Sequence, residues 1–511
     1  MTRFASFALL YMMAIVLEFA EKWKYPGFTV ALIAFVLCFA VLGFNRVGLL
    51  FFLAATTAHF ALVQLPDVAN HVNVIVYCNL MLMLGIVYSL VRIREYPSDD
   101  DFLDMARPVL QVTLILVYSL AGFAKLNADF LNPEVSCVGS LLADLTAVAR
   151  STEFRIPAIA GLVAGVSVAS PRVAGIVPGK PGPIAIAAGA AAFFALAAVS
   201  VLKLLPTLTP WLGLYAVLAM ACIVITWELI GGPLLAVPRL QAPILAFSWM
   251  MHSTLALIGF VDFGALALTL LLTFVPAPYA GLANSQVRTP FLRRRMHRMH
   301  VYIGLCLTAG IASGLHERLL AGILFNVGAL VLVWPILTAG GLRGRPAWQG
   351  VPLSFGRTPR WLLLFPLVLA LHGLTSYLGL RTAGNFTMFS NLRTEGARSN
   401  HLVLGGNPLK LWNYQEDAVR FIRINDRKVK IGYQYQPLRG NQLPVVEFRK
   451  LIYAWTAAGA TVPMTFEYQG EVHSTENIVT DPAWRTGSRD WEMRLLDFRV
   501  IQAAGPNRCR W

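Results

Sequence analysis

The sequence predicts an all-α polytopic membrane helix bundle with a small extracytoplasmic α+β C-terminal domain. Hydrophobic residues make up 57% of the 511 positions and charged residues only 14%, and the mean hydropathy is +0.61. Apolar stretches of about 17–25 residues, the length that crosses a bilayer, recur along most of the chain. Near residue 381 the sequence changes abruptly to polar and alternating patterns. We therefore expect a multi-span bundle over 1–380 and a separate domain over 381–511.

About thirteen apolar segments are candidate membrane spans. They lie near residues 4–20, 28–44, 48–64, 72–91, 108–125, 157–177, 184–205, 209–230, 244–259, 262–277, 299–317, 320–338 and 361–380. No small-residue cleavage site follows the first segment, so we interpret it as an uncleaved span and not as a signal peptide. The stretch 244–277 is too long for one crossing, and the glycines at 259 and 264 predict a break there.

The basic residues of the short loops predict the orientation of the chain. Arg46, the pair Arg92 and Arg94, Arg172 with Lys180, the run Arg293–Arg298 and the stretch Arg343–Arg360 all fall on one side of the map. That side is expected to be cytoplasmic, because positive short loops stay inside. The prediction is a multi-pass protein of the cell (inner) membrane, with a cytoplasmic N-terminus and an extracytoplasmic C-terminal domain. The net charge of +15 is mostly this orientation signal and also suits contact with membrane lipid; no nucleic-acid motif is present.

The C-terminal region has the alternating pattern of half-buried strands. We expect strands over 419–424, 428–435 and 462–468, and a short amphipathic helix over 446–457. A region of about 130 residues is large enough for a core of its own. In the loop before the fifth apolar segment, the run Asp99–Asp101 predicts a solvated stretch.

Two basic side chains are the strongest candidate site residues. Lys125 ends the fifth apolar segment and His71 opens the fourth, so both are expected at the outer end of the bundle. An ammonium is costly in hydrocarbon, which makes Lys125 a functional candidate; alternatively, it snorkels to the interface and does no chemistry. His252 lies within a span beside Ser253, where a hydrogen-bonded packing role and a catalytic role both remain open. No metal-ligand spacing is found.

These residues occur in motifs that resemble a known family. The dipeptide Asn70-His71, the run Gly122-Phe-Ala-Lys-Leu-Asn-Ala-Asp-Phe130, and Met251-His252 followed by Ile258-Gly-Phe are similar to the HTTM (horizontally transferred transmembrane) family over roughly residues 1–280. The segment Met388–His401 resembles the tail of bacterial members. The family includes the vitamin K-dependent γ-glutamyl carboxylase.

The resemblance implies a chemistry, namely that of a carbon–carbon lyase. Lys125 would be the base that deprotonates reduced vitamin K or another membrane quinol. The quinol then reacts with O₂, and the resulting strong base drives carboxylation of a glutamate in a protein or peptide on the extracytoplasmic side. His71 would assist the glutamate or CO₂ step. A partly desolvated amine at the mouth of a bundle loses its proton more easily, which agrees with the role of Lys125.

The sequence also departs from the carboxylase pattern. Ala124 stands where the carboxylase has a second lysine, Asn127 where it has an aspartate, and Phe130 where it has a tryptophan. The outer region is also much shorter. Two functions therefore remain open: a quinol- and O₂-dependent carboxylase, or a non-catalytic membrane module that binds a lipid or quinone and presents an outer partner-binding domain.

Cysteine placement predicts one disulfide. Of the six cysteines, Cys137 and Cys509 are the two placed outside the apolar segments, on the extracytoplasmic side of the map. An oxidising compartment favours joining them, and the carboxylase likewise ties an outer segment of its membrane part to its lumenal domain. The alternative is a free surface thiol at Cys509, which two arginines flank.

Overall fold

A computed structural model describes most of the chain. The described residues are 2–22, 24–43, 45–65, 69–151, 210–275, 298–341, 350–396, 399–405, 409–424, 428–431, 434–485 and 489–509. The spans expected near 157–177 and 184–205 lie outside them, as does nearly all of the basic run Arg293–Arg298. The chain forms two compact units: Met1–Asn45, Ser140–Ala216 and Leu245–Val351 make the first, and Arg46–Gly139, Val217–Ile244 and Pro352–Trp511 make the second. The expected boundary after residue 380 falls inside the second unit.

Five helical stretches among the described residues are long and apolar enough to cross a membrane. They are Arg3–Ala20, Arg46–Gln64, Asn70–Val91, Asp99–Lys125 and Gly213–Leu234. Each coincides with an expected span. Five more expected spans coincide with apolar helices of 10–17 residues, namely Pro26–Leu42, Val261–Phe274, Val301–Gly314, Arg318–Leu332 and Arg360–Leu374. The chain is thus mainly helical, with apolar helices where the sequence predicts them.

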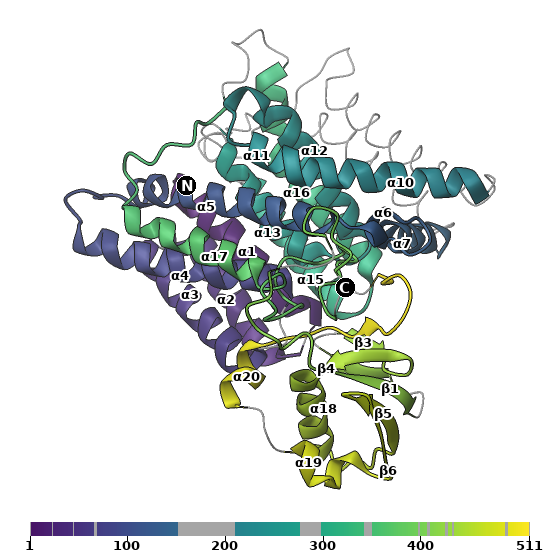
Figure 1. Ribbon diagram of the computed structural model, residues 1–511. Helices are drawn as coiled ribbons and strands as arrows, with labels where there is room; N and C mark the ends of the chain where they lie inside the picture. The colour runs from purple at the N-terminus through teal and green to yellow at the C-terminus, as the bar shows by residue number, and fades with distance from the viewer. Residues whose placement is uncertain are drawn as a thin grey trace. The chain divides into compact units, whose positions relative to one another are not determined.

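The first unit is built around its N-terminal helix. Helix α1 (Arg3–Lys22) packs against α2 (Pro26–Leu42), α13 (Val261–Leu271) and α15 (Arg298–Gly314), and α15 runs along α16 (Arg318–Gly341) (Figure 1). The expected break near residue 260 is confirmed: α12 (Gln241–Leu257) ends before α13 begins, and Gly259 between them has φ +114°. That conformation is open to glycine and strained for other residues. Helix α7 (Cys137–Ser151) begins at the end of the second unit's first segment.

The helices of the second unit pack side by side. Helix α4 (Asn70–Val91) contacts α3 (Arg46–His59), α5 (Asp99–Ala124) and α17 (Leu364–Leu374), and α17 also contacts α5. A short connection joins α4 to α5. The π-helical turn η1 (Phe60–Gln64) extends α3, and the 3₁₀ turn η6 (Arg360–Leu363) leads into α17.

The expectation of a solvated loop at Asp99–Asp101 is wrong. These residues form the first turn of α5, where Ser98 and Asp101 make a reciprocal capping box. The Ser98 hydroxyl accepts the backbone N–H of Asp101 at 3.1 Å, and the Asp101 carboxylate accepts the backbone N–H of Ser98 at 3.2 Å. Carboxylates in a first turn are also favoured by the helix dipole.

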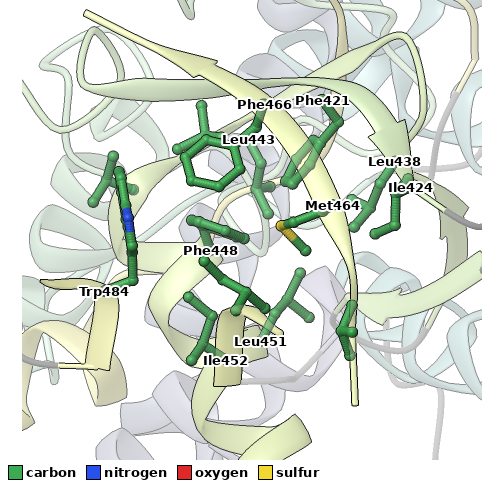
Figure 2. Close-up of a cluster of buried hydrophobic side chains, with 14 of the residues drawn as sticks. Phe421, Ile424, Leu438, Leu443, Phe448, Leu451, Ile452, Met464, Phe466 and Trp484 are labelled. Carbon is green, nitrogen blue, oxygen red and sulfur yellow. The ribbon is translucent and has the colours of Figure 1, made fainter. Parts of the chain in front are cut away.

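The C-terminal part of the second unit contains a five-stranded antiparallel sheet with the order β6-β5-β1-β4-β7. Its strands are β1 (Ala418–Ile424), β4 (Asn441–Pro444), β5 (Met464–Tyr468), β6 (Glu471–Thr475) and β7 (Ile501–Gln502). Helix α18 (Val445–Ala457) buries Phe448 against Phe421, Phe466 and Trp484 (Figure 2). Two expected strands and the expected helix are confirmed. The third expected strand is instead a hairpin, β2 (Lys428–Ile431) with β3 (Gln434–Pro437). Two short helices, α19 (Pro482–Arg485) and α20 (Asp490–Leu495), lie between β6 and β7 in the chain.

Candidate functional site

Lys125 is held inside the second unit, where it forms a short ion pair. It lies directly after the last residue of α5, and its Nζ is 2.6 Å from Oε2 of Glu228. The side chains of Lys125 and Glu228 are only 6% and 12% exposed. The Lys125 ammonium also donates to the carbonyl of Ala121 at 3.4 Å. The lysine is therefore satisfied by protein groups and not by solvent.

An irregular helical turn places Glu228. Helix α10 (Pro210–Thr226) continues into the π-helical turn η2 (Trp227–Gly231) and the short helix α11 (Gly232–Leu234). A π-turn inserts a residue into the helical register and often marks a functional site. Here it directs the Glu228 carboxylate towards the end of α5. Because carboxylates in apolar helices are costly unless paired, Lys125 is the group that stabilises Glu228 there.

Two glycines allow this close approach. A Cβ atom on Gly122 would lie 2.7 Å from the backbone nitrogen of Leu229, and a Cβ atom on Gly232 would lie 2.7 Å from the Cβ of Tyr118. Both distances are well inside van der Waals contact. Helix α5 and the η2–α11 segment therefore pack nearly backbone to backbone, which brings Glu228 within reach of Lys125.

An aromatic cluster lies at the end of α5, around Phe123, which is two residues before Lys125. The ring of Phe123 lies 5.5 Å from that of Tyr377 and 4.5 Å from that of His401, and the last two rings are 5.6 Å apart. The Tyr377 hydroxyl is buried and has no hydrogen-bond partner within the described part of the chain. An unpaired buried hydroxyl is costly and suits a site that a polar ligand atom completes.

The His401 side chain connects the end of α5 to the loop that begins directly after His401. Its Nε2 donates to the carbonyl of Phe123 at 2.9 Å, while its Nδ1 accepts the backbone N–H groups of Val403 and Leu404 at 3.2 Å each. This arrangement fits one tautomer of the neutral imidazole, with the proton on Nε2. A proton on Nδ1 would face two donors and disrupt the loop.

The neutral state of His401 predicts a pH-dependent stability. Burial lowers the pKa of His401 below its ordinary value of 6.5, and the hydrogen bond to Phe123 offsets part of this change. The unfolded state then binds more protons than the folded state below pH 6.5, so the free energy of unfolding falls as the pH drops through that range. In thermal unfolding at about pH 7.5 and about pH 5, His401→Gln should show a smaller loss at acid pH than the parent protein. An equal loss in both proteins would contradict this assignment.

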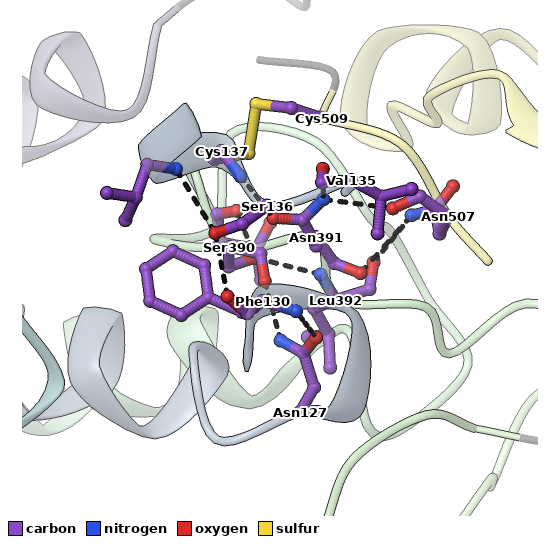
Figure 3. The surroundings of a disulfide bond; sticks show 12 residues. Asn127, Phe130, Val135, Ser136, Cys137, Ser390, Asn391, Leu392, Asn507 and Cys509 are labelled. Carbon is purple, nitrogen blue, oxygen red and sulfur yellow. Dashed lines mark hydrogen bonds between the residues drawn. A yellow bond between two sulfur atoms is a disulfide. The ribbon is translucent and has the colours of Figure 1, made fainter. Parts of the chain in front are cut away.

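Two polar residues of the motif around Lys125 anchor a distant segment. Asn127 donates to the carbonyl of Ser390 at 2.5 Å, and its own side-chain oxygen accepts the backbone N–H of Phe130 (Figure 3). The carboxylate of Asp129 accepts the Asn400 amide at 2.7 Å and the backbone N–H of Asn507 at 2.8 Å. These motif residues thus hold the segment 384–401 in place. Lys125 is the motif residue whose side chain makes the buried ion pair.

His71 lies in the first turn of α4 and is buried. Its neighbours bind the same segment: Asn70 accepts the backbone N–H of Phe386 at 2.5 Å, and Asn73 donates to the carbonyl of Gly384 at 2.7 Å. The segment 384–401 therefore contacts the start of α4 and the end of α5. Since α4 and α5 are antiparallel neighbours, His71 and Lys125 belong to the same end of this hairpin. That they face one cavity stays a prediction.

The segment 384–401 contains unusual backbone conformations. Phe386, Phe389 and Asn391 have φ values of 65°, 53° and 53°, which non-glycine residues rarely adopt. All three side chains are buried. Asn391 is stabilised by accepting the backbone N–H of Cys137 at 2.8 Å and by donating to the carbonyls of Val135 and Asn507. Strained backbone of this kind gathers at ligand sites, and it needs such a network to persist.

The expected disulfide between Cys137 and Cys509 is confirmed. The two residues are bonded, with Cα atoms 4.7 Å apart, within the second unit (Figure 3). The backbone N–H of Cys509 also donates to the carbonyl of Val135 at 3.3 Å. Cys38, Cys78, Cys222 and Cys306, which were placed in apolar segments, are free. The bond ties the C-terminus next to Asn391 and the segment 384–401.

His252 belongs to α12 in the first unit, whereas Lys125 and His71 belong to the second. The His252 side chain is buried, and its ring packs edge-on against Phe263 at 4.9 Å. This ring contact agrees with a packing role for His252. Its catalytic role stays a prediction.

The sequence did not identify Glu228 or Tyr377 as site residues. It also did not predict that His401 lies beside α5. A signal for Glu228 was present, because an acid inside an apolar segment is a functional candidate by the same argument as a lysine. The other two residues lie in irregular backbone, for which the sequence offers no periodicity. Comparison of the chain with protein-family models, curated proteins and solved structures finds no match.

Proposed function

We propose that the chain is a membrane carboxylase of the HTTM type, which uses a membrane quinol and O₂ to carboxylate an acidic group on the extracytoplasmic side. The observation that supports this most is the buried pair of Lys125 and Glu228 at the end of α5. In hydrocarbon or a dry protein interior, such a pair is an expensive arrangement that is retained where it has a use.

The aromatic cluster at the same end of α5 fits a quinol ring. Phe123 and Tyr377 offer flat apolar surfaces, and the Tyr377 hydroxyl is a buried polar group without a protein partner among the described residues. These residues would hold the ring, with Lys125 and Glu228 beside a hydroxyl oxygen. When bound, the quinol supplies with O₂ the strong base that the carboxylation of glutamate requires.

The pair acts as one proton acceptor. In the resting pair, the Lys125 ammonium donates a hydrogen bond of 2.6 Å to the Glu228 carboxylate. Accepting a proton from a substrate hydroxyl protonates the Glu228 carboxylate and leaves the Lys125 ammonium in place. The pair then has a net positive charge, which stabilises the negative charge left on the oxygen. Burial strengthens this interaction because little water screens it.

The disulfide supports the proposed orientation. Disulfides such as the one between Cys137 and Cys509 persist in oxidising compartments, whereas the cytoplasm keeps thiols reduced. Cys137 follows the end of α5 by a short connection, so this end of the helix would face the extracytoplasmic side of the cell membrane. The segment 384–401 would lie there too, next to a protein or peptide substrate.

The test is quinol-dependent incorporation of labelled CO₂ into acidic peptides by the purified full-length protein. Lys125→Ala should lower the rate by at least about a hundredfold, the contribution typical of a positioned acid or base. Glu228→Gln should lower it as well, since Lys125 would then lack the proton-accepting partner.

A second buried pair offers a matched control. Lys450 and Glu447 of α18 form an ion pair of 2.9 Å with side chains 14% and 4% exposed. Lys450→Ala should leave the rate near the parent value in protein that remains folded. Carboxylation that persists in a folded Lys125→Ala protein removes the proposal. A parent protein that is inactive but binds quinone favours the non-catalytic membrane module.

A further inference from the structure

The loop after His401 exposes an unusual apolar surface. Six of the eight described residues in 402–412 are large apolar residues with exposed side chains, and we call them the apolar loop. They are Leu402 (55% exposed), Val403 (65%), Leu404 (38%), Leu409 (71%), Leu411 (60%) and Trp412 (42%). Exposed apolar surface gathered in this way marks an interaction site.

The charged residue of the loop is turned away from this surface. The Lys410 side chain is only 12% exposed and forms an ion pair with Glu416. Its ammonium also donates to the carbonyl of Gly396 at 3.0 Å. Lysine normally extends its charge into water, so the inward position of Lys410 leaves the described residues of 402–412 without a charged side chain that faces outwards.

Backbone hydrogen bonds hold the loop at the ends of two apolar helices. Leu402 donates to the carbonyl of Leu126, two residues after α5, at 2.8 Å. Leu411 and Trp412 donate to the carbonyl of Leu378, shortly after α17, at 3.1 and 3.2 Å. A Cβ on Gly379 would lie 2.0 Å from the Trp412 carbonyl oxygen, so this approach requires glycine. The loop is therefore fixed at the level where α5 and α17 end.

The helix α17, next to whose end the loop is held, carries an exposed apolar stripe. Leu364, Leu367, Val368, Leu371 and Leu374 are all exposed, by between 37% and 58%. Their spacing of three and four residues puts them on one helical face. For a helix in a membrane, this face is the lipid-facing one. Leu378, whose carbonyl accepts the hydrogen bonds from the loop, is four residues after Leu374, the last residue of this stripe.

We infer that the apolar loop inserts into the outer leaflet of the membrane, with acyl chains as its partner. Tryptophan and leucine at the level of a helix end are typical of segments that lie in the membrane interface. The inference rests on the membrane location in the proposed function but not on carboxylation. It predicts that a lipid-soluble substrate reaches the aromatic cluster around Phe123 and His401 beside a lipid-embedded loop.

Spin labels on the full-length protein in lipid nanodiscs test the inference. In a background with Cys38→Ser and Cys222→Ser, one label is attached through Val403→Cys and a matched label through Val472→Cys. Both valines are 65% exposed in the second unit, but Val472 lies on strand β6 of the sheet. Collisions with O₂, which concentrates among acyl chains, should exceed those with a water-soluble nickel chelate severalfold at 403. The order should be reversed at 472.

A third label, through Val87→Cys on the exposed face of α4, separates the possible failures. An aqueous signal at 403 with a lipid signal at 87 overturns the inference and leaves the membrane location standing. Aqueous signals at both positions overturn the membrane location too. A label at 403 that is shielded from both reagents means that protein covers the loop, which also refutes insertion. Leu411→Cys repeats the measurement at the other end of the loop.

Discussion

Replacing Lys125 by methionine while Glu228 remains is expected to lower the free energy of unfolding by about 3–5 kcal/mol. The change leaves a carboxylate that is 12% exposed without its partner at 2.6 Å. The double variant Lys125→Met/Glu228→Leu should recover most of this loss, because two apolar side chains of similar volume replace both charges. Denaturant or thermal unfolding in detergent measures all three proteins.

An exposed ion pair is the control for this experiment. Arg420 and Glu467 face each other across β1 and β5 at 3.4 Å, with side chains 57% and 36% exposed. Arg420→Met should change the stability by less than about 1 kcal/mol. A loss as small as this for Lys125→Met would mean that the Lys125–Glu228 pair is solvated and does not form a strong proton-accepting site.

Loss of the disulfide is the second change with a large expected effect. The bond between Cys137 and Cys509 spans 372 residues of sequence. For a closed loop of this length, the chain-entropy model gives about 6 kcal/mol of stabilisation, and measured gains are often smaller. Cys137→Ala/Cys509→Ala should therefore unfold at a clearly lower temperature than the parent protein in the absence of reductant.

A reductant provides the internal control. It should lower the unfolding temperature of the parent protein to near that of the double variant and leave the variant itself unchanged. Alkylation of unreduced, denatured protein should modify Cys38, Cys78, Cys222 and Cys306, which are free, and spare the bonded pair. Modification of Cys509 under those conditions would refute the bond and remove its support for the proposed extracytoplasmic placement.

Local pattern was sufficient for much of the fold. The length and apolarity of the segments predicted helices because a continuous apolar run leaves the backbone no other way to satisfy its polar groups. Alternation predicted β1 and β5, and an amphipathic repeat predicted α18. Local pattern gave a wrong prediction at Asp99–Asp101. The acidic composition indicated a solvated loop, whereas Ser98 was a capping signal for the start of α5. Local pattern also failed at 428–435, where one alternating run contains two short strands.

Lys125 could be chosen from the sequence because a charge at the end of an apolar helix is conspicuous without any knowledge of its neighbours. Cys137 and Cys509 could be paired because the predicted topology put these two cysteines, and no others, on the extracytoplasmic side. The partners of Lys125 and of the α5 end could not be chosen in this way. Glu228 is 103 residues from Lys125, and His401 is 278 residues from Phe123. Backbone packing at Gly122 and Gly232 and the hydrogen bonds of Asn127 bring these groups together, and such contacts depend on three-dimensional geometry that no local pattern encodes.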